Sequence, residues 1–312
     1  MIVTLTVNPA LDRTIALDAA LRPGEVQSAR SAQEEAGGKG VNVSRVVAAA
    51  GVDTLAVLPL ASEDPYRAPL AATGIPTVAV PVTRQVRTNL AITDPDGVTT
   101  KVNLPGSPLS LADSASVVAA VVDASADADW LVLAGSLPDS AAATFYVDVV
   151  RAVRARRGSR SPRIAVDASG PALLEIVTHA SVDLIKPNDD ELAELLGVAV
   201  DGSSPEAIVD TVRAIVPERV AAALVTLGGS GAALVTAEGA WFAPAPRIRV
   251  VSTVGAGDSS LAGYLLADLA GAEAATRLAS AVRYGAAAAS LPGTQVPTAA
   301  DLGSHDISVR SI

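Results

Sequence analysis

The segment Val250–Ser260 joins a β-branched run to an Ala- and Leu-rich run through a turn that carries two glycines and an aspartate. Small residues at Gly255, Ala256 and Gly257 let backbone N–H groups approach an anion closely, and a helix that begins there adds the positive end of its dipole. Asp258 follows directly, so a carboxylate stands beside a potential phosphate site. For such a turn taken alone, the structural alternative is that Asp258 only caps the helix.

A second glycine-rich turn, Ala36–Arg45, also leads into a predicted helix. Its glycines let backbone amides face a polyhydroxy ligand, while Lys39 adds a positive charge and Asn42 adds both a donor and an acceptor. A tight loop with a solvated lysine explains this segment equally well when it is taken alone. Neither turn is a standard nucleotide fingerprint: Gly255–Gly257 lacks the third glycine of G-x-G-x-x-G, and Gly40 stands where a Walker loop needs Ser or Thr.

Two further strand ends carry polar or glycine-rich turns. Asn188 and Glu191 follow an apolar strand and share one face of a predicted helix, where they can hold the water shell of Mg²⁺. A helix cap is the favoured interpretation of these two residues alone. The turn Thr226–Gly231 allows a nucleotide to approach the backbone closely, or it simply connects two strands.

The elements that must position these turns alternate along the chain. Short β-branched runs are followed by Ala-rich runs of helical length, a pattern typical of βαβ units that feed a mostly parallel sheet. Strands are predicted at residues 1–7, 54–58, 130–134, 163–167, 183–185 and 223–227, and helices at 41–50, 111–124, 141–156, 189–196, 205–216, 258–270 and 274–289. We therefore expect the 312 residues to form a single α/β domain.

Residues 88–103 break this alternation, because two β-rich runs flank the turn Asp94–Gly97, whose proline and glycine suit a hairpin. Together with residues 13–34, the hairpin is expected to form a small second sheet. This sheet is predicted to act as a lid, formed from about residues 12–35 and 86–106, over the strand ends where ligands bind in α/β enzymes.

Composition excludes several classes of function. The chain has no cysteine and only 2 histidines, which excludes disulfides and thiol catalysis and disfavours a His-based zinc site. A net charge of −10 disfavours nucleic acid and anionic membranes as partners, so a phosphorylated substrate would depend on local cations such as Lys39 and Arg87. The first residues indicate a buried strand rather than a secretory signal, and no uncharged apolar run is long enough to span a bilayer, so we expect a cytoplasmic protein.

In this order, the four turns resemble the ribokinase-like (PfkB) carbohydrate kinase family over nearly the whole chain. The two signatures of that family resemble Gly37–Arg45 and Ser252–Ser259. Between them, Asn188–Glu191 is similar to the N-x-x-E metal segment of the family, and Thr226–Gly231 is similar to its ATP-binding turn. Their joint occurrence disfavours the helix-cap interpretation, first of all for Asp258. The resemblance implies an ATP-dependent kinase with a three-layer α/β/α fold, a mostly parallel central sheet and a small β lid.

Within the family, the sugar-phosphate branch is the most similar, and the enzymes of fructose 1-phosphate are nearest. The likeness lies in Thr6–Asp12, Gly24–Val26, Arg87–Asn89, Gly135–Pro138 and Val250–Val254. It implies ATP-dependent phosphorylation of a ketohexose phosphate, first of all fructose 1-phosphate to fructose 1,6-bisphosphate. Tagatose 6-phosphate, fructose 6-phosphate, an unphosphorylated sugar or nucleoside, and a non-catalytic sugar-phosphate sensor stay open as alternatives.

The resemblance also implies roles for individual residues in phosphoryl transfer. Asp258 is the expected base, and because a free Asp has a pKa near 3.9, the proton must move late, as the bond to the γ-phosphorus develops. The N–H groups expected to stabilise the migrating phosphoryl group belong to Gly255, Ala256 and Gly257. The residues expected to bind sugar hydroxyls are Asp12, Gly38, Lys39 and Asn42. Arg87 and Lys39 are expected to face the phosphate that the substrate already carries.

Contacts with ATP and with cations are implied in the same way. The expected ATP contacts are Lys186, Asn188, Thr226, Gly228 and Gly231. Asn188 and Glu191 are expected to hold Mg²⁺ through water, and K⁺ is a candidate second cation. A homodimer through the lid is a candidate assembly, because the hairpin carries four apolar residues: Leu90, Ile92, Val98 and Val102.

Three departures from the branch fall on the sugar side. Ala91 stands where a lysine is usual, Asp139–Ser140 replaces a glycine after the Ser-Leu-Pro segment, and Ala61–Asp64 stands in place of Gly-Lys-Asp. These departures therefore bear on which substrate binds rather than on phosphoryl transfer.

Overall fold

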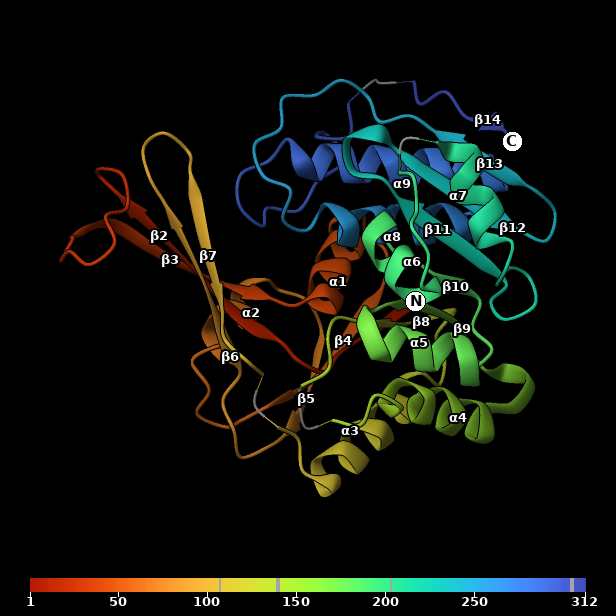
Figure 1. Cartoon of the computed structure of the whole chain (residues 1–312). Coiled ribbons are helices and arrows are strands. Elements are labelled where there is room, and N and C mark those ends of the chain that lie inside the picture. Colours follow the sequence, from red (N-terminus) through yellow and green to blue (C-terminus); the bar gives the residue numbers. More distant parts are fainter. Residues whose placement is uncertain (107, 139–140, 203, 304–305) are drawn as a thin grey trace.

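The computed structural model describes residues 1–106, 108–138, 141–202, 204–303 and 306–312. Among these residues, a sheet of 10 strands lies between two layers of helices, and a separate four-stranded sheet projects to one side (Figure 1). The predicted three-layer α/β/α fold with a small β lid is confirmed. The departure at Asp139–Ser140 lies outside the described residues.

The large sheet is parallel over most of its width. Its parallel strands, in spatial order, are β5 (Thr77–Pro81), β4 (Thr54–Leu60), β1 (Ile2–Thr6), β8 (Trp130–Ala134), β9 (Arg163–Asp167), β10 (Leu184–Ile185) and β11 (Ala222–Thr226). β1 and β8 are buried along their whole length, as expected for strands covered on both faces. An antiparallel edge that the sequence analysis did not predict continues the sheet through β12 (Ala232–Thr236), β13 (Ala240–Ala243) and β14 (Arg310–Ser311).

Helices from different parts of the chain cover the two faces of this sheet. One face packs against α3 (Leu111–Ala124), α4 (Phe145–Arg157), α5 (Gly170–His179), α6 (Asp189–Leu196) and α7 (Pro205–Val212). The other packs against α1 (Lys39–Ala49), α8 (Ala256–Leu269) and α9 (Ala274–Ala289). The short α2 (Arg67–Ala72) contributes to a third cluster beside β4, and two 3₁₀ turns lie at Gly158–Arg160 and Gly228–Ser230. Among the described residues, no helix combines the length and the apolar character that crossing a membrane requires.

The second sheet has the strand order β3-β2-β6-β7. It consists of β2 (Ala10–Leu17), β3 (Ala29–Gly37), β6 (Arg87–Thr93) and β7 (Thr99–Asn103). The β6–β7 hairpin forms as predicted, and its turn is held by Asp94, whose Oδ1 accepts hydrogen bonds from two backbone N–H groups at 3.0 and 2.9 Å. In the register of the sheet, Asp12 lies opposite Asn89 on one side and Glu35 on the other. Movement of this sheet as a lid stays a prediction.

Candidate active site

A cavity of about 930 Å³ lies where the carboxyl ends of β9, β10 and β11 meet the first turns of α1 and α8. This volume is in the range of small-molecule sites. Its lining includes all residues that the sequence analysis assigned to ATP, to Mg²⁺ or to phosphoryl transfer: Lys186, Asn188, Glu191, Thr226, Gly228, Gly231, Gly255, Ala256, Gly257 and Asp258. Lys39, which it assigned to the sugar side, lines the same cavity. The fold therefore brings four segments that are distant in sequence to one cavity.

Asp258 does not cap its own helix. Gly255 is the N-cap residue of α8 in a left-handed conformation, φ 75°, and no side chain forms a capping hydrogen bond there. Instead, Asp258 Oδ2 accepts a hydrogen bond of 2.8 Å from Asn42 Nδ2 on α1. The helix-cap interpretation of Asp258 is therefore wrong, and the two glycine-rich motifs meet through this bond.

The surroundings of Asp258 make its carboxylate more basic than usual. Burial raises its pKa to about 6, and the negative charge of Asp167 acts in the same direction. The hydrogen bond from Asn42 and the charges of Lys39 and Lys186 act in the opposite direction. The carboxylate is therefore ionised near neutral pH, yet its pKa is closer to the working pH than that of an ordinary aspartate, which suits a general base.

Asp167, at the end of β9, is a central residue that the sequence analysis did not assign to the site. Its side chain is fully buried; Oδ1 accepts a hydrogen bond of 2.7 Å from Lys39 Nζ, and Oδ2 lies 3.2 Å from Lys186 Nζ. Burial acts to raise the pKa of Asp167, but the charges of Lys186 and Lys39 outweigh it and hold that pKa below its usual value. The sequence signal that could have identified Asp167 is its position at the carboxyl end of a predicted buried strand, where ligands bind in parallel sheets.

Lys39 and Lys186 are held in place by these ion pairs. Lys39 Nζ also lies 3.8 Å from Glu191 Oε1, and although burial lowers the pKa of Lys39, the nearby carboxylates raise it above its usual value. Lys186 faces the turn at the start of α8, since a Cβ atom placed on Gly257 would be 3.4 Å from Lys186 Nζ. Both ammonium groups are therefore paired with Asp167, and that of Lys186 also lies beside the predicted anion site.

Asn188 and Glu191 form the helix cap that was their favoured interpretation, and they also line the cavity. Asn188 Oδ1 accepts a hydrogen bond of 2.7 Å from the backbone N–H of Glu191, and Glu191 Oε2 accepts one of 2.9 Å from the backbone N–H of Asn188. This capping box leaves Glu191 Oε1 on the Lys39 side. The two interpretations are compatible, and a role in metal binding stays a prediction.

The predicted sugar-side residues lie around the start of α1 and on the second sheet. Asp12 Oδ1 accepts a hydrogen bond of 2.8 Å from Asn89 Nδ2, and burial raises the pKa of Asp12 against this bond and the charge of Arg87. The turn that begins α1 packs closely on the first strands: Gly38 has φ 128°, and a Cβ atom on it would lie 2.7 Å from Thr6 Cγ2. Asp12, Gly38 and Arg87 do not line the large cavity, but Asn42 connects the sugar side to it through its bond to Asp258.

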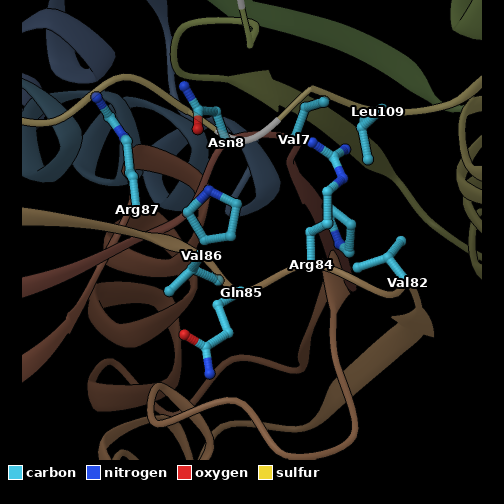
Figure 2. Close-up of a pocket in the computed structure, with 10 residues that line it drawn as sticks. Val7, Asn8, Val82, Arg84, Gln85, Val86, Arg87 and Leu109 are labelled. Atoms are coloured by element: carbon cyan, nitrogen blue, oxygen red, sulfur yellow. The ribbon is translucent and has the colours of Figure 1, made fainter.

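Arg87 lines a smaller pocket between the segment after β1 and the connection from β5 to β6 (Figure 2). Asn8 and Arg84 line it too, and in Figure 2 Asn8 lies between the two guanidinium groups. Lys39 lines the other cavity and is bonded to Asp167, and the predicted binding of one phosphate by Arg87 and Lys39 stays a prediction.

One wall of the large cavity is apolar, and the sequence analysis did not assign it. The segment before α8 and one face of α9 contribute the residues Ile248, Val250, Val282, Ala286 and Ala289. Small residues on an Ala-rich helix indicate close packing, which is also present: a Cβ atom on Gly285 would lie 2.2 Å from Ser260 Oγ on α8. The small residues of α9 therefore serve two purposes: they pack closely against α8, and they line the cavity. Their composition indicates only the packing.

Relatives of the chain are kinases of sugar phosphates. The 1-phosphofructokinase of Rhodobacter capsulatus is 34% identical over 291 residues, which cover 91% of this chain and 90% of that protein. The 1-phosphofructokinase of Escherichia coli K12 is 31% identical over 285 residues, covering 90% and 89%. The crystal structure of phosphofructokinase-2 from Escherichia coli in complex with substrates and products superimposes with a TM-score of 0.86, at 27% identity and 96% coverage of both chains.

The model of the pfkB family carbohydrate kinases matches residues 6–301, which include both glycine-rich motifs and Asp258. The family match, the fold and the residues that line the cavity thus all indicate a carbohydrate kinase. The chain belongs to the pfkB family of carbohydrate kinases and is an ATP-dependent sugar kinase.

Proposed function

We propose that this kinase transfers the γ-phosphoryl group of ATP to the C6 hydroxyl of fructose 1-phosphate and forms fructose 1,6-bisphosphate. Relatives named 1-phosphofructokinase, between 30% and 34% identical over most of the chain, support this substrate. The single observation that carries the chemistry is the position of Asp258, a buried carboxylate in the first turn of α8, which lines the cavity together with Gly255, Ala256 and Gly257.

In the proposed reaction, the C6 oxygen attacks the γ-phosphorus while the bond from that phosphorus to the ADP oxygen breaks. Asp258 receives the hydroxyl proton late in this step. The backbone N–H groups of Gly255, Ala256 and Gly257, together with the nearby Lys186 ammonium, stabilise the charge on the migrating group. Asn42 holds the base through the 2.8 Å bond to its Oδ2.

ATP is proposed to occupy the large cavity, with its adenine ring against the apolar wall of α9 and its phosphates toward α8. The proposed contacts are Lys186, Asn188, Thr226, Gly228 and Gly231, all of which line the cavity. No group of three His, Cys, Asp or Glu side chains within the described ranges is arranged to hold a metal ion directly. Asn188 and Glu191 supply oxygen donors, which suit Mg²⁺ held through water. When bound, Mg²⁺ neutralises charge on the transferring phosphates.

The sugar is proposed to bind between the start of α1 and the second sheet, with Asp12, Asn42 and the Gly38 backbone at its hydroxyls. Asn42 Oδ1 supports this placement, because it is buried and has no hydrogen-bond partner within the described chain, so a hydroxyl can donate to it. Arg87 is proposed to bind the phosphate at C1. Lys39 lines the ATP cavity instead and is paired with Asp167.

Three further proposals concern assembly, ions and location. A homodimer can form through the β6–β7 hairpin, where Val98 and Val102 are 64% and 45% exposed. Potassium activation is proposed because one similar structure is that of Escherichia coli phosphofructokinase-2 in complex with potassium. A cytoplasmic location stays the prediction made from the sequence.

The experiment that tests the substrate is an ADP-release assay with equal concentrations of several acceptors. These are fructose 1-phosphate, fructose 6-phosphate, tagatose 6-phosphate, fructose, ribose and adenosine. We expect every sugar phosphate to exceed the neutral acceptors in kcat/KM, because a neutral acceptor offers Arg87 no anionic partner. We expect fructose 1-phosphate to be the best of them, as the names of the relatives indicate. A higher value with fructose 6-phosphate or tagatose 6-phosphate would contradict the proposed substrate, and a higher value with ribose or adenosine would also contradict a sugar-phosphate kinase.

A further inference from the structure

Lys39 cannot be counted as a free cation for the sugar phosphate. Its ammonium group is 2.7 Å from Asp167 Oδ1 and 3.8 Å from Glu191 Oε1, and it lines the large cavity. Its charge is therefore already compensated on the ATP side of the site. If Arg87 alone faced the phosphate of the substrate, one guanidinium group would have to balance a dianion.

The pocket around Arg87 has a charge that differs from that of the whole protein. The chain carries a net charge of −10, yet the residues that line this pocket include Arg84 and Arg87 and no Asp or Glu. Asn8 also lines it and offers an amide. The pocket volume is about 20 Å³, enough for a water-sized group and too small for a sugar ring. Its lining therefore suits an anion, and its volume admits a group of the size of one phosphate oxygen.

Both arginines have a buried nitrogen that a ligand can satisfy. Arg84 Nη1 and Arg87 Nε are buried and have no hydrogen-bond partner within the described part of the chain. Leaving such donors unpaired is costly, whereas a phosphate oxygen accepts from guanidinium nitrogens well. Both arginines line the same pocket, and in Figure 2 the Asn8 side chain lies between their guanidinium groups.

The backbone between the two arginines is hydrogen-bonded to the buried Asp64. Asp64 Oδ2 accepts a hydrogen bond of 2.8 Å from the backbone N–H of Val86, and Asp64 Oδ1 accepts one of 2.9 Å from that of Tyr66. Asp64 is 4% exposed and Tyr66 is fully buried, so this anchor belongs to the packed core. The backbone beside Arg87 is therefore tied to the packed core at Val86, two residues after Arg84.

We infer that Arg84 is a specificity-determining residue, which binds the phosphate already carried by the substrate together with Arg87, in the position that the sequence analysis gave to Lys39. This inference rests on the proposed function. It assigns the discrimination between a phosphorylated and a neutral sugar to two arginines on the β5–β6 connection.

The test compares Arg84→Gln, Arg84→Lys and a matched control, Arg156→Gln, which removes an exposed arginine of α4 outside both cavities. Loss of a charged hydrogen bond should raise the KM for fructose 1-phosphate about 10- to 100-fold in Arg84→Gln. The inhibition constant of inorganic phosphate should rise in parallel, while the KM for ATP and the midpoint of thermal unfolding stay unchanged. Arg84→Lys should recover part of the loss, and the control should match the wild type.

An unchanged KM for fructose 1-phosphate in Arg84→Gln overturns the inference, as does an equal rise in the KM for ATP. Failure of the proposed function looks different: the wild type then phosphorylates no sugar phosphate. In that case, titration calorimetry with inorganic phosphate, on the wild type and on Arg84→Gln, still decides about Arg84. Weaker binding by the variant supports the pocket, and equal binding, or none by either protein, overturns it.

Discussion

Helix α8 carries two buried aspartates, one near each end, whose partners differ. Asp258 and Asp268 are 6% and 5% exposed, so burial alone does not distinguish them. Asp268 forms ion pairs with Arg163 at 2.5 Å and Arg277 at 2.9 Å, and it accepts a hydrogen bond of 2.8 Å from Trp130 Nε1. Its negative charge is thus balanced by two guanidinium groups.

Asp258 has a neutral amide, Asn42, as its hydrogen-bond donor, and its pKa is raised to about 6. The comparison teaches that a buried carboxylate becomes available for proton transfer when its charge is left largely uncompensated. A buried carboxylate whose charge is balanced holds elements together instead: Asp268 joins α8 to α9 and to the first residues of β8 and β9.

Asp258→Asn gives the sharpest test of this difference. We expect kcat to fall about 100- to 10,000-fold, because the amide cannot accept the hydroxyl proton. Binding of the sugar phosphate, measured by calorimetry, should change little, since an amide keeps the shape and can still accept from Asn42. A rate equal to that of the wild type would show that another group is the base.

Asp268→Ala should act on stability instead. Removing it leaves two arginines without their buried partner, and since their side chains are 44% and 30% exposed, water can replace part of the loss. We expect the free energy of unfolding to fall by about 3 kcal/mol, the low end for a broken buried ion pair. Chemical denaturation measures this change. Near-normal kcat in the folded variant is expected as well, and a loss of kcat like that of Asp258→Asn would break the comparison.

The pH dependence of stability should also carry the signature of Asp258. Because its folded-state pKa of about 6 is above the ordinary value of 3.8, the folded protein binds the proton more tightly than the unfolded chain. This stabilisation is fully present below about pH 4 and is lost as the pH rises through about 6. Subtracting the unfolding free energy of Asp258→Asn from that of the wild type cancels the other groups. The difference should fall by up to about 3 kcal/mol between pH 4 and pH 7; a flat difference would contradict the raised pKa.

Of the four predictions, the substitution Asn42→Ala is expected to have the smallest effect. The hydrogen bond from Asn42 lowers the pKa of Asp258, so its removal should move the acidic limb of the kcat/KM profile from about pH 6 to higher pH. The position of the limb is the diagnostic quantity, because the same substitution also removes a proposed sugar contact. A limb that stays in place or moves to lower pH would show that Asn42 does not tune the base.

Local signals predicted much of the fold. α3 and α6 have the predicted bounds because each begins with a capping box, Ser110 with Asp113 and Asn188 with Glu191. The antiparallel edge β12–β14 was not predicted, since its strands are short and partly Ala-rich. Its pairing also depends on a partner strand at the very end of the chain.

The candidate site was predictable where its residues lie in one motif, and less so where they meet across the chain. The turn Gly255–Gly257 with Asp258 is local, so its composition reveals it. Asp167 was missed because its partners, Lys39 and Lys186, come to it only when β9 and β10 and the start of α1 pack together. The sequence shows that each residue of this cluster is present, but only the tertiary fold shows that the two lysines lie within ion-pair distance of Asp167.

The first turn of α8 begins without a side chain to complete it. In the proposed reaction, the transferring phosphoryl group accepts hydrogen bonds from N–H groups at this helix start, in place of a capping side chain. We therefore expect substrate binding to order the backbone that carries Asp258 and product release to reverse this ordering. The same contact, between the phosphoryl group and the start of α8, then serves both phosphoryl transfer and the ordering of that helix.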